Sequence, residues 1–242
     1  MVNTDDLICY HCDSKIRLGT KQDAGYVIMK DQTYDLLLSC GIGNDISFEK
    51  SFKELYPDIK TYLFDFSENA HDYYKSQNQL LSNTEYVKKK IYSNNSKTDT
   101  NLSEYVSDYH DIFLKMDIEG GEFYWNDSLN ENFLSKFKQI VIEIHLFFKI
   151  NSICKSLDQK WDLISKLSKT HYLIHIHANN VKGVRNINNV NIPEVFECTY
   201  VRRDVFKKPL LRNAQRLPCD LDYPNVCDKK DIDLNYHPFV SR

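Results

Sequence analysis

The stretch Tyr34-Asp-Leu-Leu-Leu-Ser-Cys-Gly-Ile-Gly43 joins a short apolar run to a turn that contains two glycines. The run is too short for a buried helix and has the length of a buried strand. The next segment, residues 45–56, begins with an acidic residue and carries apolar residues at helical spacing: Phe48, Phe52 and Leu55. An acid before such a pattern is typical of a helix N-terminus. These residues therefore predict a strand, a tight turn and a helix.

The same alternation continues along the chain. We expect six further strands, at residues 61–65, 85–92, 111–117, 139–145, 172–177 and 194–202. Helices are expected between the second and third strands and at residues 129–137 and 157–169. Strands that alternate with helices favour right-handed crossovers and a mainly parallel sheet with helices on both faces. The predicted fold class is therefore α/β, with a Rossmann-like, seven-stranded sheet.

The last strand departs from this alternation. It is reached through an asparagine-rich connection, residues 178–193, that carries no helical pattern. Two consecutive strands without a crossover helix between them pair in antiparallel direction. We therefore expect the sixth and seventh strands to form an antiparallel pair at one edge of the sheet.

The seven strands place a single domain core at residues 34–205 of the 242-residue chain. The flanks, residues 1–33 and 206–242, are each shorter than the roughly 50 residues of a small independent domain. We expect residues 1–33 to form a segment that covers the core. Residues 206–242 are rich in turn-forming residues and predict an irregular tail packed on the core.

The charge balance excludes some partners. With 31 basic and 34 acidic residues, the net charge is -3, so the chain has no global basic field to hold nucleic acid. No apolar run approaches the roughly 18 residues that a membrane span needs, and the N-terminus lacks the pattern of a signal peptide. An odd count of 7 scattered cysteines also favours a reducing, cytoplasmic environment.

Four of the cysteines lie near the two ends of the chain: Cys9, Cys12, Cys219 and Cys227. They would close a tetrahedral zinc site if the termini meet. The spacing of the second pair is loose for zinc, and free buried thiols are the favoured interpretation.

A ligand site is expected after the first strand, because doubly wound sheets bind ligands where the strand order reverses. Gly41 and Gly43 stand there, and Asp65 ends the second strand, where an acid binds both ribose hydroxyls. A dinucleotide also needs a third small residue for its pyrophosphate, but that position is Ile46, and Asp45 would repel phosphates. S-adenosylmethionine has no phosphate, so it is the preferred cofactor and a dinucleotide is the alternative. The expected cofactor-binding residues are Gly41, Gly43, Asp45, Asp65, Phe66 and Asp117.

The run Asp111-Ile-Phe-Leu-Lys-Met-Asp-Ile-Glu-Gly-Gly-Glu122 resembles the Lys-x-Asp-x-Glu-Gly-x-Glu motif on the fourth strand of FkbM-like methyltransferases. Further stretches similar to a subgroup of that family, among them Glu143-Ile-His145 and His177-Ala-Asn-Asn180, extend the resemblance over about residues 15 to 225. The resemblance implies an S-adenosylmethionine-dependent O-methyltransferase that acts on sugar hydroxyls of glycans or on natural-product hydroxyls.

This sequence departs from the pattern at two positions. Ser39 stands where many methyltransferases have an acid before the first glycine, and Ala24 stands where relatives often have glycine. Asp23 or Asp117 could replace the missing partner of the cofactor's amino group.

Methyl transfer to a hydroxyl requires alignment and removal of a proton, because the cofactor supplies both electrophile and leaving group. Asp117 ends the fourth strand, while Glu143 and His145 share one face of the fifth. We predict His145 as the general base, oriented by Glu143, with Asp117 near the cofactor or the acceptor hydroxyl. The alternative is that Glu143 and His145 form a structural polar pair under a loop.

Four further residues are expected to bind the acceptor, a small molecule or glycan: Glu119, Glu122, His177 and Asn179. A divalent metal held by Asp117, Glu143, His145 and Asn179 is conceivable but not expected, because hard cations prefer oxygen ligands and His145 fits poorly. The functional alternative is an inactive module of the same fold that binds S-adenosylmethionine or a protein partner. The oligomeric state cannot be read from these residues.

Overall fold

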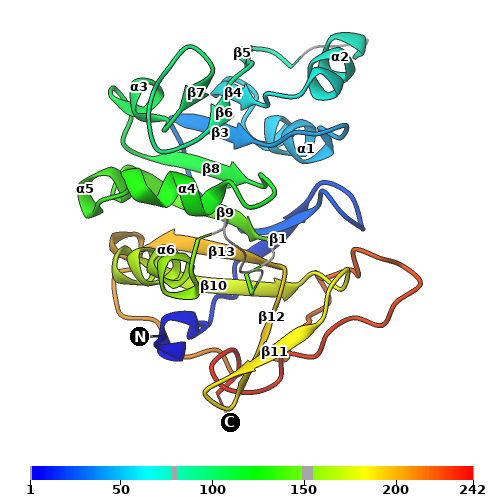
Figure 1. The fold of residues 1–242 in the computed structure, drawn as a ribbon, viewed down its shortest axis with the longest axis vertical. Helices are drawn as coiled ribbons and strands as arrows, with labels where there is room; N and C mark the ends of the chain where they lie inside the picture. The colour runs from blue at the N-terminus through cyan, green and yellow to red at the C-terminus, as the bar shows by residue number, and fades with distance from the viewer. Residues whose placement is uncertain (1, 78–80, 146, 149–154, 242) are drawn as a thin grey trace.

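The computed structural model describes residues 2–77, 81–145, 147–148 and 155–241 (Figure 1). Its centre is a seven-stranded sheet in the order β10-β13-β9-β8-β3-β4-β5. In chain order these strands are β3 (Leu36–Cys40), β4 (Lys60–Phe64), β5 (Thr84–Val87), β8 (Ile112–Met116), β9 (Phe137–Ile144), β10 (His171–Ala178) and β13 (Phe196–Arg202). All seven predicted strands are therefore present.

The pairing directions follow the expected pattern. The pairs β3–β4, β3–β8, β4–β5 and β8–β9 are parallel, whereas β13 is antiparallel to both β9 and β10. The predicted antiparallel pair thus lies at one edge, with β13 inserted between β9 and β10. The seven-stranded, mostly parallel α/β sheet is confirmed.

The two faces of the sheet are covered by different elements. Successive side chains point to opposite faces, so Leu37 and Phe113 pack against Phe48 and Phe52 of α1 (Ser47–Leu55). On the other face, the main core contains Trp125 and residues of α6 (Leu157–Thr170). The remaining helices are η1 (Thr4–Leu7), α2 (Glu68–Ser76), α3 (Ser103–Val106), α4 (Glu122–Trp125), η2 (Asn126–Ser128), α5 (Glu131–Leu134) and η3 (Arg203–Val205).

Two predicted elements have the wrong extent. The strand predicted over 85–92 is interrupted: the chain leaves the sheet after β5, and β6 (Lys90–Ile91) pairs with β7 (Asp99–Thr100) in a separate sheet. At the interruption Lys88 and Lys89 form ion pairs with Glu68 and Glu104. The helix predicted over 129–137 is limited to α5, because Asn130 caps its start by accepting the N–H of Phe133 at 2.9 Å and Phe137 already belongs to β9.

Two hairpins were not predicted from the sequence. The N-terminal segment forms β1 (Lys15–Leu18) and β2 (Tyr26–Met29), which pack on the same face as α1. The asparagine-rich connection forms β11 (Val184–Ile187) and β12 (Val190–Pro193). The turn between them has positive φ at both Asn188 and Asn189, which is the conformation that a tight two-residue hairpin turn requires.

Two buried histidines of β10 contact aspartates of the C-terminal segment. The Nε2 atom of His175 lies 2.8 Å from Oδ1 of Asp222, and that of His177 lies 3.1 Å from both carboxylate oxygens of Asp231. The N-terminal segment lies beside the same strand, where the N–H of Tyr10 donates to the carbonyl of Leu173. Segments from both ends of the chain therefore contact β10.

The contact of His177 with Asp231 predicts that the free energy of unfolding depends on pH. Burial by itself lowers the pKa of His177, but the carboxylates of Asp231 and Glu197 outweigh it and raise the pKa to about 10. Because the ordinary value is 6.5, the stabilisation is complete below about pH 6.5 and is lost as the pH rises through about 10. In urea unfolding, the free-energy difference between the wild type and His177→Gln should shrink over this range. A difference that stays constant with pH would contradict the ion pairing.

The four terminal cysteines do not gather at one point. Cys9 and Cys12 are buried in different apolar clusters, and Cys227 is exposed. Within the described ranges they form no common group of metal ligands; Cys219 lies instead with His175 and Asp222. None of the helices formed by described residues has the length and apolar character of a membrane span.

Candidate functional site

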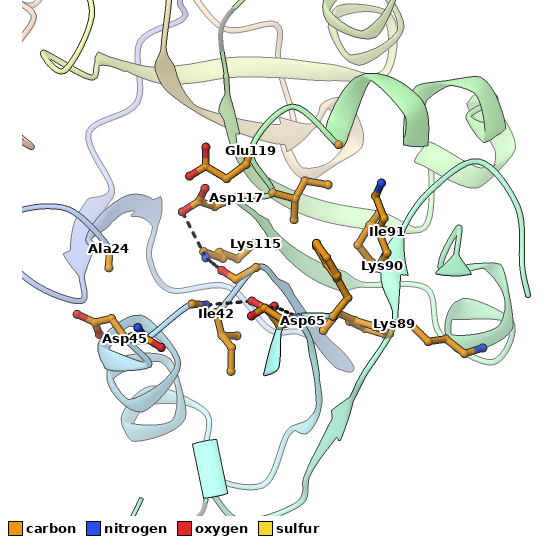
Figure 2. Close-up of a pocket in the computed structure, with 18 of the residues that line it drawn as sticks. Ala24, Ile42, Asp45, Asp65, Lys89, Lys90, Ile91, Lys115, Asp117 and Glu119 are labelled. Atoms are coloured by element: carbon orange, nitrogen blue, oxygen red, sulfur yellow. Dashed lines mark hydrogen bonds and ion pairs between the residues drawn. The ribbon is translucent and has the colours of Figure 1, made fainter. Parts of the chain in front are cut away.

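A cavity of about 430 Å³ lies at the carboxyl ends of β3, β4 and β8 (Figure 2). Its walls come from the loop after β3, the residues after β4, the segment 89–91, the end of β8 with its following loop, and the β1–β2 turn. All six residues predicted to bind the cofactor line it: Gly41, Gly43, Asp45, Asp65, Phe66 and Asp117. The cavity has the size of a small-molecule site and the position expected for a doubly wound sheet.

Gly41 allows two strand ends to approach each other. Its φ is +78°, and a Cβ atom at this position would lie 1.6 Å from the carbonyl oxygen of Asp117. A side chain here would therefore collide with the backbone after β8 and would also strain Gly41 itself. Gly43 differs, because its φ is +50° but a Cβ atom added there would meet no described atom within 4 Å.

Asp65 is held rigidly at the end of β4. Its Oδ2 accepts the N–H of Gly43 at 3.1 Å, and its Oδ1 accepts the N–H and the hydroxyl of Ser67 at 2.9 and 2.8 Å. The carboxylate thus ties the glycine loop to the segment after β4. It faces the cavity, in the position where an acid can bind vicinal hydroxyls of a ribose.

The start of α1 is unfavourable for a phosphate. Asp45 accepts the N–H of Ser47 at 2.7 Å, so one N–H group at the start of the helix is already bonded to a carboxylate, whose negative charge would repel a phosphate. Ile46, at the position where a dinucleotide site needs a small residue, is fully buried. These two observations fit a nucleoside ligand without phosphate better than a dinucleotide.

Lys115 is a site residue that sequence reasoning missed. Its side chain is almost fully buried, and its Nζ donates to the carbonyl of Gly41 at 2.6 Å from beneath the glycine loop. Below the loop, the hydroxyl of Ser39 donates to the buried carboxylate of Glu49. Glu49 is buried and does not line the cavity, so it holds Ser39 and does not face a ligand. Lys115 could have been identified from the sequence, because it is a charged residue inside an otherwise apolar strand.

Tyr26 is a second residue that sequence reasoning missed. Its hydroxyl donates to Oδ2 of Asp117 at 2.7 Å, across from the β1–β2 hairpin to the end of β8. Because the hairpin itself was not predicted, no pattern in the sequence placed Tyr26 near the site. Asp23 and Ala24 of the same hairpin line the cavity. Figure 2 shows Ala24 there.

Asp117, Glu143 and His145 are brought together as predicted. The Nε2 atom of His145 lies 3.4 Å from Oδ1 of Asp117, 3.7 Å from Oε2 of Glu143 and 3.8 Å from Oε2 of Glu119. Nδ1 of His145 is buried and has no hydrogen-bond partner among the described residues. Burial, followed by the carboxylates of Asp117 and Glu197, raises the pKa of Glu143 well above its ordinary value.

His145 lines a second cavity of about 350 Å³. The two cavities share part of their walls: Phe66, Lys90, Ile118, Glu119 and Gly121 line both. Asp117 belongs to the first cavity and lies 3.4 Å from the His145 ring of the second. The arrangement therefore offers two adjoining compartments with an imidazole and a carboxylate at their junction.

Glu119 and Glu122 occupy different environments. The Glu119 side chain is 85% exposed, and its φ of +56° is unusual for a residue with a side chain. Glu122 is fully buried, with Oε1 accepting the N–H of His145 at 2.8 Å and Oε2 accepting that of Gly120 at 2.9 Å. Glu122 lines neither cavity and holds the loop after β8 against the end of β9.

His177 and Asn179 also lie outside the walls of both cavities. His177 is buried under the C-terminal segment, as described above. Asn179 donates its side-chain amide to Oε1 of Glu143 at 2.7 Å. Asn179 thus acts on the site through Glu143, whereas His177 holds the C-terminal segment.

The cluster can also be considered as a metal site. Donor atoms of Asp117, Glu143 and His145 lie within 4.8 Å of one another. Asn179 turns its amide nitrogen, which is no metal ligand, toward Glu143. The set therefore lacks the fourth ligand that was considered from the sequence.

The strand order, with β13 antiparallel between β9 and β10, and the cavity at the carboxyl ends of β3, β4 and β8 are those of a Rossmann-like α/β sheet. The chain has this fold. No protein-family model and no curated protein sequence matches it. Among solved structures, it is similar to precorrin-6y C5,15-methyltransferase from Geobacter metallireducens GS-15, with a TM-score of 0.40 and 14% identity over 72% of this chain and 84% of that one. It is also similar to the N-methyltransferase NodS from Bradyrhizobium japonicum WM9 in complex with S-adenosyl-L-homocysteine, with a TM-score of 0.38 and 8% identity over 71% of this chain and 79% of that one.

Proposed function

We propose that the protein is an S-adenosylmethionine-dependent O-methyltransferase that acts on a sugar hydroxyl. The observation that carries the proposal is the pair of adjoining cavities with His145 and Asp117 at their junction. The first cavity has the features of a nucleoside site, and the second offers a base to an acceptor. The choice of a sugar rests on the resemblance of the Asp111–Glu122 run to FkbM-like methyltransferases.

The cofactor would occupy the first cavity. Asp65 would bind the ribose hydroxyls, and Phe66 and Ile42 supply apolar surface for the adenine. The positive sulfonium and amino groups of the cofactor suit a wall rich in carboxylates, those of Asp23, Asp45 and Asp117. When bound, the cofactor supplies a methyl group on a sulfonium that is itself the leaving group.

The protein must position the acceptor and remove its proton. In our proposal Nε2 of His145 accepts the hydroxyl proton while the oxygen attacks the methyl group. The carboxylate of Asp117, beside the ring, would stabilise the positive charge that the imidazole acquires, and Glu143 would orient the ring. Glu122 is a positioning residue, because it fixes the backbone of His145.

The cofactor assignment is tested by Asp65→Ala. The change removes two charge-assisted hydrogen bonds to the ribose, each worth about 1.5–3 kcal/mol, so affinity should fall at least about 100-fold. Isothermal titration with S-adenosylhomocysteine measures this affinity. Asp72→Ala, an exposed acid on α2, is the matched control and should bind like the wild type. An unchanged affinity for Asp65→Ala would mean that the cofactor binds elsewhere.

Turnover separates the enzyme from a binding module. The wild type is incubated with S-adenosylmethionine and a panel of sugars, sugar phosphates and glycans, and formation of S-adenosylhomocysteine is measured. Methyl transfer to a sugar oxygen supports the proposal. Tight cofactor binding without transfer to any acceptor would favour a sensing or scaffolding module instead.

A further inference from the structure

The second cavity differs in charge from the rest of the site. Three lysines line it, Lys90, Lys155 and Lys160, together with one carboxylate among the described residues, that of Glu119. The wall of the first cavity, by contrast, holds more carboxylates than lysines. The chain as a whole has a net charge of -3, whereas the residues that line this cavity carry more positive than negative charges. The acceptor compartment is therefore matched to negative charge.

Two of these lysines are fixed against aromatic rings. Lys155 has a side chain that is 17% exposed, forms an ion pair with Asp127, and places its Nζ 5.5 Å from the centre of the Tyr124 ring. Lys160 is 3% exposed, with its Nζ 4.9 Å from the centre of the Phe123 ring. Cations with so little exposure are weakly screened by salt, so they attract an anion in the cavity more strongly than surface lysines do.

The same wall offers flat apolar surface. Tyr124, which lines the cavity, is stacked on Tyr92 with ring centres 5.2 Å apart. Phe66, on the wall between the two cavities, is 61% exposed. Aromatic faces of this kind can pack against the apolar side of a ring-shaped ligand. The cavity thus combines ring-binding surface, a base and a group of ammonium ions.

We infer that the acceptor is a phosphorylated sugar, with its hydroxyl at His145 and its phosphate at Lys90, Lys155 and Lys160. This inference rests on the proposed function and narrows its substrate class. A phosphate carries more charge than a carboxylate and presents several oxygens, so it can pair with more than one lysine at once. The phosphate belongs either to a sugar monophosphate or to the diphosphate of a nucleotide sugar.

Binding of inorganic phosphate and pyrophosphate tests this inference without knowledge of the sugar. Both anions are titrated into the protein saturated with S-adenosylhomocysteine. At least one should bind, and Lys155→Gln and Lys90→Gln should each weaken that binding about tenfold, the loss expected for one charge-assisted hydrogen bond. Lys75→Gln, an exposed lysine on α2, is the control and should bind like the wild type. Preference for phosphate indicates a monophosphate, and preference for pyrophosphate indicates a nucleotide sugar.

The outcomes distinguish this inference from the proposed function. Wild type that binds S-adenosylhomocysteine but neither anion, or lysine variants that bind the anions as tightly as the wild type, would overturn the inference and leave the methyltransferase proposal intact. Failure of the wild type to bind S-adenosylhomocysteine would overturn the proposed function instead.

Discussion

His145→Ala should lower the rate of methyl transfer by about 100- to 10,000-fold, the usual contribution of a general base. Affinity for S-adenosylhomocysteine should stay close to that of the wild type, because His145 lines the second cavity and not the first. The measurement is kcat by product formation together with cofactor affinity by titration. Added imidazole should restore part of the rate, because the deleted ring leaves space open to the second cavity.

Two results would contradict this role. Activity that survives in His145→Ala would show that another group takes the proton. Loss of wild-type activity on treatment with EDTA, restored by a divalent cation, would make His145 a metal ligand together with Asp117 and Glu143. In the proposed mechanism EDTA leaves the rate unchanged. His110→Ala, at a position that lines neither cavity, is the matched control for removal of an imidazole.

Gly41→Ala should abolish measurable cofactor binding. The new Cβ would lie 1.6 Å from the carbonyl oxygen of Asp117, on a residue whose φ is +78°. The glycine loop and the end of β8 must then move apart, which breaks the hydrogen bond from Lys115 to the Gly41 carbonyl. Overpacking and the left-handed conformation together should cost roughly 2–5 kcal/mol of stability. Thermal unfolding and titration with S-adenosylhomocysteine below the melting temperature measure both effects.

Gly183→Ala is the control for this substitution. Gly183 lies in the connection before β11, and a Cβ there meets no described atom within 4 Å. Its stability and cofactor affinity should therefore match those of the wild type. Wild-type cofactor affinity in folded Gly41→Ala would show that the loop can move without consequence and that the cofactor does not depend on it.

The sheet was predictable because its strands are buried and differ in pattern from the helices. β3 and β8 are buried along their whole length and are apolar except for Ser39 and Lys115, and mostly apolar runs are what buried parallel strands produce. The short elements were not predictable in the same way. β1 and β2 have four residues each, and their place in the molecule depends on packing against Phe48 of α1.

The candidate site was predictable where its residues follow strands. Gly41, Asp65, Asp117 and His145 each come at or just after the carboxyl end of a strand, so their meeting follows from strand order alone. Contacts that cross between distant segments were not predictable. The hydrogen bond from the Tyr26 hydroxyl to Asp117 depends on how the β1–β2 hairpin packs on the sheet. The sequence pattern does not predict this packing.

The two chain ends beside β10 have a consequence for self-association. β10 is the last strand of the sheet, and such a strand offers unpaired backbone groups to other molecules. In this chain the backbone of Tyr10 pairs with Leu173, and the segment containing Asp222 and Asp231 covers the histidines of the same strand. The terminal segments thus hinder pairing of this edge strand with a strand of another molecule. Removing the N-terminal segment would expose backbone groups of β10 to pairing with a strand of another molecule.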